Sequence, residues 1–313
     1  MMGDFFQSRL FDNRQVRRAF SRAAAGYDAA SPLQREIESR LLESLDYYAL
    51  RHGDAQPGVI LDVACGPARA AHALRARWPK SRVIALDAAL PMLHAARNNT
   101  RGHFLREREI PRINADLRAL PLADGSVDVL FCNLALQWVE DLPAAFTEFR
   151  RVLKTGGMLL VSTFGSETLA DLREAFATAD DLPHVSPFTA IAPFGDALVA
   201  AGFRDPVLDR DILVEYKPTF ADILRSLRAM GATNALSARR HSLSGRARFT
   251  AAEAAHVRDA RGFPMRWEAI YAQAWAPEPG TPMRDGMGEL AHVPVSNIPI
   301  RRRQSARGES RGE

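Results

Sequence analysis

Cysteine and long apolar runs are the scarcest features of this sequence. Only Cys65 and Cys132 occur among 313 residues, which excludes a disulfide scaffold and makes a reducing cytoplasm the expected compartment. Each ends a predicted strand, where burial as a small apolar residue is favoured over redox chemistry. No apolar run approaches the ~20 residues that cross a bilayer. Residues 1–6 lack a basic segment followed by a long apolar one, so we expect neither a secretory signal nor a membrane partner.

Acidic and basic residues nearly balance. The 41 lysines and arginines exceed the 37 aspartates and glutamates by four, and the pI is near 9.4. This small excess weakly favours an acidic partner, either a nucleic acid or an acidic carrier protein. No spacing of histidine and cysteine suggests a metal site. With 47% hydrophobic residues, the chain can bury a core as one large domain or one domain with an insertion.

The middle of the chain alternates strands and helices. Strands are predicted near 59–64, 82–87, 110–115, 127–132 and 157–164, with helices between them that include 70–78, 91–98 and 143–153. Short connections between such elements indicate an α/β fold in which helices cover both faces of a mostly parallel sheet.

The two ends of the chain do not show this strand–helix alternation. The start is helical, with a break near residues 26–28. After Phe164, helices near 167–179 and 193–201 precede a strand near 206–215. The expected parts are a helical lid (1–58), a Rossmann-like core (59–217), a helical cap insertion (218–262), a last strand (263–276) and a tail (277–313) with a disordered end (302–313). The last two strands suit an antiparallel pair at the sheet edge.

Acidic residues follow successive strands where a ligand of an open α/β sheet binds. Asp62 precedes the glycine turn at Gly66, and Asp87 ends the second strand, where it suits a ribose diol or, alternatively, the start of the next helix. Asp116 suits an adenine amine or an Asx-type turn. A dinucleotide site keeps the approach to the turn neutral for a pyrophosphate, whereas a carboxylate there suits a cation.

S-adenosylmethionine (SAM) combines a ribose, an ammonium group and a sulfonium, and this pattern resembles the first motif of class I SAM-dependent methyltransferases. That resemblance predicts that SAM is bound by a set of residues around the strand ends, namely Asp62, Ala64, Gly66, Asp87, Ala88, Asp116, Leu117 and Asn133. The turn departs from the usual Gly-x-Gly, because Pro67 and Ala68 follow Gly66. We therefore expect the Ala68 Cβ to approach the methionine part of SAM.

The fourth strand continues as Asn133-Leu134-Ala135-Leu136-Gln137-Trp138. Methyltransferases that act on base amino groups or on glutamine usually have Asn/Asp-Pro-Pro-aromatic at this place. Its absence argues against those acceptors and against a nucleic-acid partner. Gln137 and Trp138 are candidates to face the acceptor; the alternatives are core packing for Trp138 and a surface position for Gln137.

Several stretches carry a more specific resemblance. They are residues 16–28 with Leu33-Gln34, then residues 85–93, 119–124, 137–141, 162–165 and 227–234, and the final Ala274-Trp275. Together they resemble the malonyl-acyl-carrier-protein O-methyltransferases of biotin synthesis, over about residues 14–276. The opening helix and Met230–Asn234 are the most particular to that family.

The resemblance implies transfer of the SAM methyl group to the free carboxylate of a malonyl thioester on acyl carrier protein. A carboxyl group with a pKa near ~4 is ionised at neutral pH, so no general base and no His–carboxylate pair are expected. Methyl transfer to another small acceptor, and SAM binding without transfer in an assembly factor, remain alternatives.

Tyr27, at the break in the lid, is the candidate catalytic residue, with aromatic packing as its alternative. An arginine should orient the acceptor carboxylate; Arg18 near the lid is one candidate. Arg239 and Arg240, in the insertion, could also meet the acidic carrier protein. His184 is a candidate substrate contact, with a structural hydrogen bond as its alternative.

Overall fold

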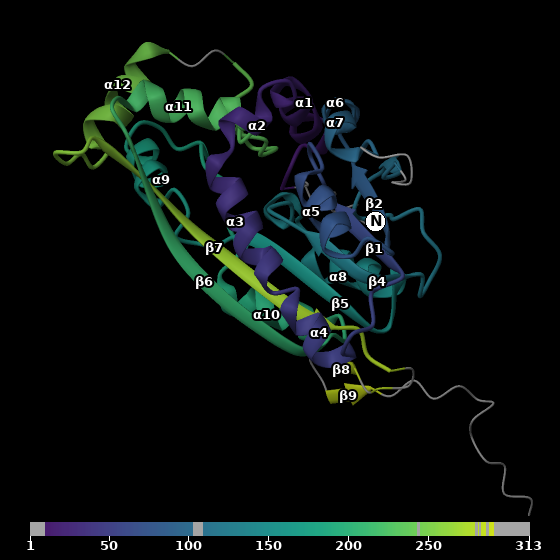
Figure 1. Ribbon diagram of the computed structural model, residues 1–313. Coiled ribbons are helices and arrows are strands. Elements are labelled where there is room, and N and C mark those ends of the chain that lie inside the picture. Colours follow the sequence, from purple (N-terminus) through teal and green to yellow (C-terminus); the bar gives the residue numbers. More distant parts are fainter. Residues whose placement is uncertain are drawn as a thin grey trace, which may run out of the picture.

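A seven-stranded sheet forms the centre of the molecule in the computed structural model, which describes residues 10–102, 109–242, 245–278, 281, 283–285 and 288–290 (Figure 1). The strand order is β3-β2-β1-β4-β5-β7-β6. The strands are β1 (Val59–Val63), β2 (Arg82–Asp87), β3 (Arg112–Asn114), β4 (Val127–Cys132), β5 (Leu153–Phe164), β6 (Arg204–Lys217) and β7 (Phe263–Trp275).

The strands β1 to β5 are parallel, and β7 runs antiparallel to β5 and to β6. The predicted α/β fold with an antiparallel pair at the edge is thus confirmed; within that pair, β7 lies inside and β6 forms the edge. The central strands are buried on both faces, as expected where helices cover a parallel sheet. All parallel strands consequently end on the same side, where the chain must turn into its helices.

Helices cover the two faces of the sheet unequally (Figure 1). One core joins the strands to α3, α5, α9 and α11, and a second core joins them to α8 and α10. The helices are α1 (Asn13–Ala23), α2 (Tyr27–Ala30), α3 (Pro32–Glu43), α4 (Asp46–His52), α5 (Arg69–Arg77), α6 (Leu90–Ala95), α7 (Arg97–Thr100), α8 (Leu142–Val152), α9 (Ala170–Ala177), α10 (Ile191–Ala200), α11 (Phe220–Ala229) and α12 (Arg246–Ala255), with a 3-10 turn, η1 (Leu136–Trp138).

The N-terminal helices and the insertion between β6 and β7 contact each other over the carboxyl ends of the strands. Asp12 N donates to the carbonyl of Ala235 at 2.8 Å, and its carboxylate caps α1 while pairing with Arg239 at 3.0 Å. Gly231 has φ +76°, and a Cβ there would lie 2.9 Å from the Phe20 ring, so only glycine allows this approach. Among the described residues of the insertion, helix is confined to α11 and α12, and the segment 230–242 between them is not helical.

Within the described part of the tail, two short strands, β8 (Met283–Asp285) and β9 (Gly288–Leu290), pair antiparallel. The segment 302–313, predicted to be disordered, lies outside the described residues. No helix in the described ranges is long and apolar enough to traverse a bilayer. The division into lid, core, cap and tail stays a prediction.

Candidate active site

A cavity of about 360 Å³, which we call the strand-end cavity, lies where β1, β2 and β4 end. Residues of α1 and of the loop after β3 complete its walls. The structure brings together here most of the residues predicted to hold SAM: Ala64, Gly66, Asp87, Ala88, Asp116, Leu117 and Asn133. These residues are far apart in sequence, and the shared direction of the parallel strands is what gathers them.

The turn from β1 into α5 is held by Asp87. The Gly66 amide donates to the Asp87 carboxylate at 2.9 Å, and the Ala89 amide, at the start of α6, donates to its other oxygen at 2.7 Å. Burial raises the pKa of Asp87, although both amides oppose the shift. The helix-start alternative is therefore present in the structure, and the same carboxylate also lines the cavity.

The position of Ala68 bears on one expectation from the sequence. It adopts φ +60° at the start of α5, is fully buried, and packs in the core with α5 and the strands. It lines none of the three described cavities. The structure thus gives no support to an approach of its methyl group to the cofactor, because the side chain is packed in the core.

Asp62 lies outside the strand-end cavity, in a small adjoining space of about 40 Å³ that we call the acidic pocket. It is 2% exposed and accepts from the Ala71 amide of α5 at 3.0 Å. Burial and the neighbouring Glu38 carboxylate hold the pKa of Asp62 well above its usual range. Glu38, from α3, has a pKa raised to about 7, chiefly by burial. With Asp28, three carboxyl groups thus line the pocket beside the glycine turn, together with Arg35 and Arg69.

Asp116 and Leu117 both line the strand-end cavity. The Asp116 carboxylate accepts from the Arg118 amide at 3.0 Å and pairs with the Arg118 guanidinium, which holds the pKa of Asp116 below its ordinary value. The Asx-type turn proposed as an alternative is therefore formed. It places an ionised carboxylate at the cavity wall.

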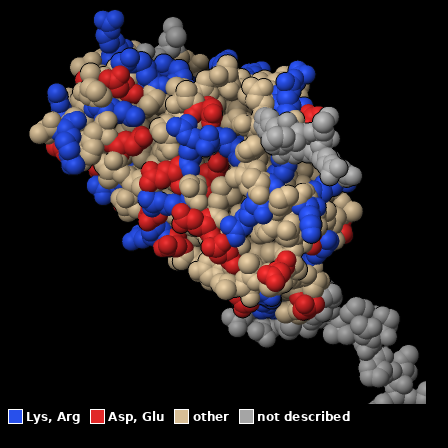
Figure 2. Space-filling model, in the orientation of Figure 1, with Lys and Arg blue, Asp and Glu red and all other residues tan. Residues whose placement is uncertain are grey.

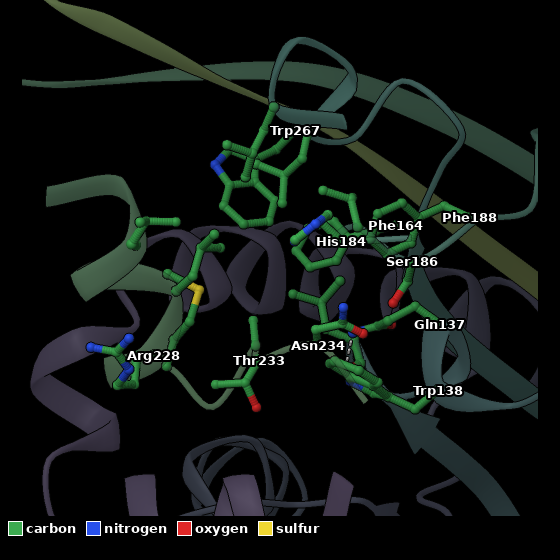
Figure 3. A pocket seen from close by; sticks show the side chains of 18 of the residues that line it. Gln137, Trp138, Phe164, His184, Ser186, Phe188, Arg228, Thr233, Asn234 and Trp267 are labelled. Atoms are coloured by element: carbon green, nitrogen blue, oxygen red, sulfur yellow. Dashed lines mark hydrogen bonds between the residues drawn. The ribbon is translucent and has the colours of Figure 1, made fainter. Parts of the chain in front are cut away.

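A second cavity of about 220 Å³, the cap cavity, adjoins the first (Figure 3). Its walls are mainly apolar and come from α9, α11, the segment 184–188 and Trp267 of β7. The predicted acceptor contacts Gln137, Trp138 and His184 all line it. The two cavities share four lining residues: Phe20, Tyr27, Leu134 and Trp138. These four side chains therefore form the boundary that the two cavities share.

Tyr27 lines all three cavities and packs against Phe20, with ring centroids 6.3 Å apart. Burial, aided by the carboxylates of Asp87 and Glu38, holds the pKa of Tyr27 well above its usual value. The phenol is therefore protonated at neutral pH and is available as a hydrogen-bond donor. Both predicted roles of Tyr27, aromatic packing and contact with the reactants, are compatible with its place between the cavities.

Four residues that line the cap cavity each carry a buried polar atom that has no hydrogen-bond partner in the described part of the chain. The atoms are Trp138 Nε1, Trp267 Nε1, Thr233 Oγ1 and Gln34 Oε1. An unpaired buried donor or acceptor costs roughly 1–3 kcal/mol, which a polar ligand in the cavity would recover. Three of the four groups are donors, so they suit a ligand that carries oxygen acceptors.

His184 and the cap arginines meet at one carboxylate. Asp180 accepts from His184 Nε2 at 2.8 Å and from Arg248 Nε at 3.1 Å, and it pairs with Arg240 at 3.4 Å. This His–carboxylate pair was not expected from the sequence. The structural hydrogen bond proposed for His184 is thus formed, and the His184 ring stacks on Phe176 while lining the cap cavity.

The structure does not bring the predicted arginines to the cavities. Arg239 and Arg240 are engaged by Asp12 and Asp180 and line none of the three. Arg18 is exposed on α1 and also lines none. Instead, Arg228 of α11 lines the cap cavity while remaining exposed, on the side away from Gln137 and Trp138 (Figure 3).

Sequence reasoning missed Glu38, Gln34, Thr233 and Arg228. A signal existed for the first two: Gln34 and Glu38 lie one helical turn apart on α3, beside the buried Leu33, Ile37 and Leu41. A polar pair on the apolar side of a helix needs a polar neighbour or a ligand. Thr233 and Arg228 lie in a stretch that carries the family resemblance, but nothing in the sequence indicated that they line a cavity.

Comparisons with known proteins identify the family of this chain. Residues 61–161 match the model of the "Methyltransferase domain" family. The malonyl-[acyl-carrier protein] O-methyltransferase of Xylella fastidiosa is 52% identical over 95% of this chain and 99% of its own length. This chain belongs to the malonyl-[acyl-carrier protein] O-methyltransferase family. The family's protein from Methylovorus is 42% identical, over 91% of this chain and 96% of its own length.

A solved structure supports the fold. A candidate methyltransferase of Bacillus halodurans superposes with a TM-score of 0.51 at 19% identity, over 74% of this chain and 98% of that one. Membership of the malonyl-[acyl-carrier protein] O-methyltransferase family implies SAM as methyl donor. The strand-end cavity fits it, because acidic groups line both that cavity and the pocket beside it. In the described ranges no cluster of His, Cys, Asp or Glu could hold a metal ion.

Proposed function

We propose that this protein transfers the methyl group of SAM to the free carboxylate of malonyl-acyl-carrier protein and so forms a methyl ester. The substrate is inferred from the names of the relatives. The structural observation that supports it is the junction of the two cavities at Tyr27 and Trp138, since residues that line the second cavity carry unpaired donors that an oxygen-rich acceptor could engage.

The chemistry needs orientation rather than proton transfer. SAM, when bound, supplies an electrophilic methyl group that passes to a carboxylate oxygen as the carbon–sulfur bond breaks and its electron pair stays on sulfur. The acceptor carboxylate is already ionised at neutral pH, so neither His184 nor Asp180 has a proton to remove. The protein's task is to align the two reactants, and alignment can contribute up to about 7–11 kcal/mol.

On the donor side, we assign the ribose to Asp87 and the adenine to Asp116 and Leu117, in line with their places on the wall of the strand-end cavity. The acidic pocket, where Asp28, Glu38 and Asp62 outnumber the two arginines, suits the ammonium group. A positive charge there would favour the ionised forms of carboxyl groups whose pKa values are raised by burial. Asn133 lines both spaces and is held by the Ser162 hydroxyl, which donates at 2.7 Å.

On the acceptor side, Trp138 is suited to hold the carboxylate. Its indole N–H is buried without a partner, and a hydrogen bond to a charged oxygen is worth about 1.5–3 kcal/mol. Tyr27, protonated and at the same junction, can donate as well. The apolar walls, which include Phe164, Leu227 and Trp267, exclude water from the reaction. Arg228 marks the exposed side through which the carrier's arm would leave.

Methyl transfer itself tests this function. Purified protein is incubated with methyl-labelled SAM and malonyl-acyl-carrier protein, and label should appear on the carrier as a base-labile methyl ester. Acetyl-acyl-carrier protein, which lacks the free carboxylate, is the matched control and should gain no label. Label on neither carrier, despite SAM binding, would overturn the proposal in favour of a binding protein. Restored biotin-free growth of a strain that lacks this activity provides the cellular check.

A further inference from the structure

The outer side of α1 carries an unusual row of arginines. Arg14, Arg18 and Arg22 follow one another at four-residue spacing, and Arg17 lies beside them; all four are exposed. The helix contains no acidic residue. Within the described part of the chain, none of the four forms an ion pair with a carboxylate. Arg17 acts at longer range on the Asp116 carboxylate, and Arg14, Arg18 and Arg22 are left without a paired carboxylate among the described residues.

This arrangement does not help α1 to fold. Like charges four residues apart on a helix repel each other and destabilise it. Elsewhere in the described part of the chain, some exposed arginines form ion pairs, such as Arg77 with Asp46 at 2.5 Å, whereas others, such as Arg82, do not; what sets α1 apart is that four of them lie on one helix. The row on α1 is therefore better suited to a negatively charged partner than to the stability of the chain itself.

The row lies next to both cavities. Arg14 and Arg17 line the strand-end cavity and are exposed, so that cavity reaches the surface beside α1. Arg228 likewise lines the cap cavity and is exposed. It lies on α11, which contacts α1. Figure 2 shows lysine and arginine side chains at the upper left of the molecule, over α12 and α11, with acidic side chains among them. We call Arg14, Arg17, Arg18, Arg22 and Arg228 the arginine rim.

We propose that the arginine rim is the docking surface for the acyl carrier protein, which would be held through its acidic side chains while its phosphopantetheine arm enters the cap cavity past Arg228. This inference rests on the proposed function. A carrier protein with negative surface charge and a phosphate on its arm complements five arginines around the opening. The surface predicted from the sequence, Arg239 and Arg240, is unsuitable because both guanidinium groups are engaged by carboxylates of the same chain.

The test reverses two charges of the rim that line no cavity. In the double variant Arg18→Glu/Arg22→Glu, KM for malonyl-acyl-carrier protein should rise roughly tenfold or more at low salt, because rim charges act mainly on association. The KM for malonyl-pantetheine, which carries no carrier protein, should stay unchanged. The KM of the wild type for the carrier substrate should rise with salt, and that of the variant should not.

Two further variants serve as controls. Arg82→Glu changes an exposed arginine at the start of β2, the opposite end of that strand from Asp87, and should leave both KM values unchanged. Arg18→Lys/Arg22→Lys keeps the charges and should retain most of the affinity for the carrier.

The outcomes separate the possibilities. An unchanged KM for the carrier substrate overturns the docking surface. An equal rise for the carrier and pantetheine substrates also overturns it, because the lesion would then lie in the cavity or in the folding of α1. Salt-dependent binding of duplex DNA at the rim, with no effect of the variant on the carrier, points to another partner and overturns it as well. Absence of transfer to both thioesters by the wild type would contradict the proposed function instead.

Discussion

Replacing Glu38 by glutamine should change how the stability of the ligand-free protein depends on pH. Burial raises the pKa of Glu38 from its ordinary 4.5 to about 7, and Asp28 adds to the rise, while Arg69 and Arg35 oppose it. Its side chain is 16% exposed, so solvent screens the effect little. A rise of this size corresponds to about 3 kcal/mol in unfolding free energy.

The sign follows from proton binding. Between pH 4.5 and 7 the folded protein keeps a proton on Glu38 that the unfolded chain has released, so the contribution of this group is complete below pH 4.5 and is lost as pH rises through 7. Glutamine has the shape of the protonated form and cannot ionise. The Glu38→Gln variant should therefore equal the wild type near pH 4 and exceed it by up to about 3 kcal/mol at pH 8.

Urea unfolding at several pH values measures the difference. Asp62 and Asp87 also have raised pKa values, so only the difference between variant and wild type isolates Glu38. Glu36→Gln is the matched control on the same helix: Glu36 is half exposed and pairs with Arg40, and its loss should cost less than about 1 kcal/mol. Parallel stability curves for Glu38→Gln and wild type would refute the assignment of a buried, protonated Glu38.

Three further changes probe the rest of the site. Asp87→Asn should weaken SAM binding tenfold or more in calorimetry, because the ribose would lose a charged acceptor; unaltered affinity refutes that role. Trp138→Phe keeps the ring but removes the unpaired N–H, so kcat/KM for the malonyl carrier should fall about 10- to 100-fold while SAM affinity is kept, and an undiminished rate would show that the indole does not hold the acceptor. Arg239→Glu should lower Tm by placing two carboxylates together at Asp12, whereas an unchanged Tm with a raised KM for the carrier would restore Arg239 as a docking residue.

Much of the fold followed from local pattern. The predicted strands 82–87 and 127–132 match β2 and β4 to the residue, because their apolar runs are short and are bounded by turn residues. The segment 91–98 was predicted as one helix, but the structure has two, because α6 ends at Ala95 and α7 begins at Arg97. Helix boundaries depend on caps and on tertiary contacts, which a periodic pattern does not report.

The candidate site, too, was predictable in part. Residues that follow strands, such as Asp87 and Asp116, were gathered as expected because parallel strands end together. Ion pairs between distant segments were not foreseeable. Arg239 meets Asp12, 227 residues away in the chain, and this contact ties the segment 230–242 to the start of α1. The roles of the individual site residues remain predictions.

A ternary crystal structure tests the central claim most directly. The protein would be crystallised with S-adenosylhomocysteine and a non-reactive malonyl-pantetheine amide. The account predicts the nucleoside in the strand-end cavity with its ribose on Asp87, and the malonyl carboxylate between Tyr27 and Trp138, with the pantetheine leaving past Arg228. A nucleoside bound elsewhere, or a carboxylate held away from that junction, would contradict it.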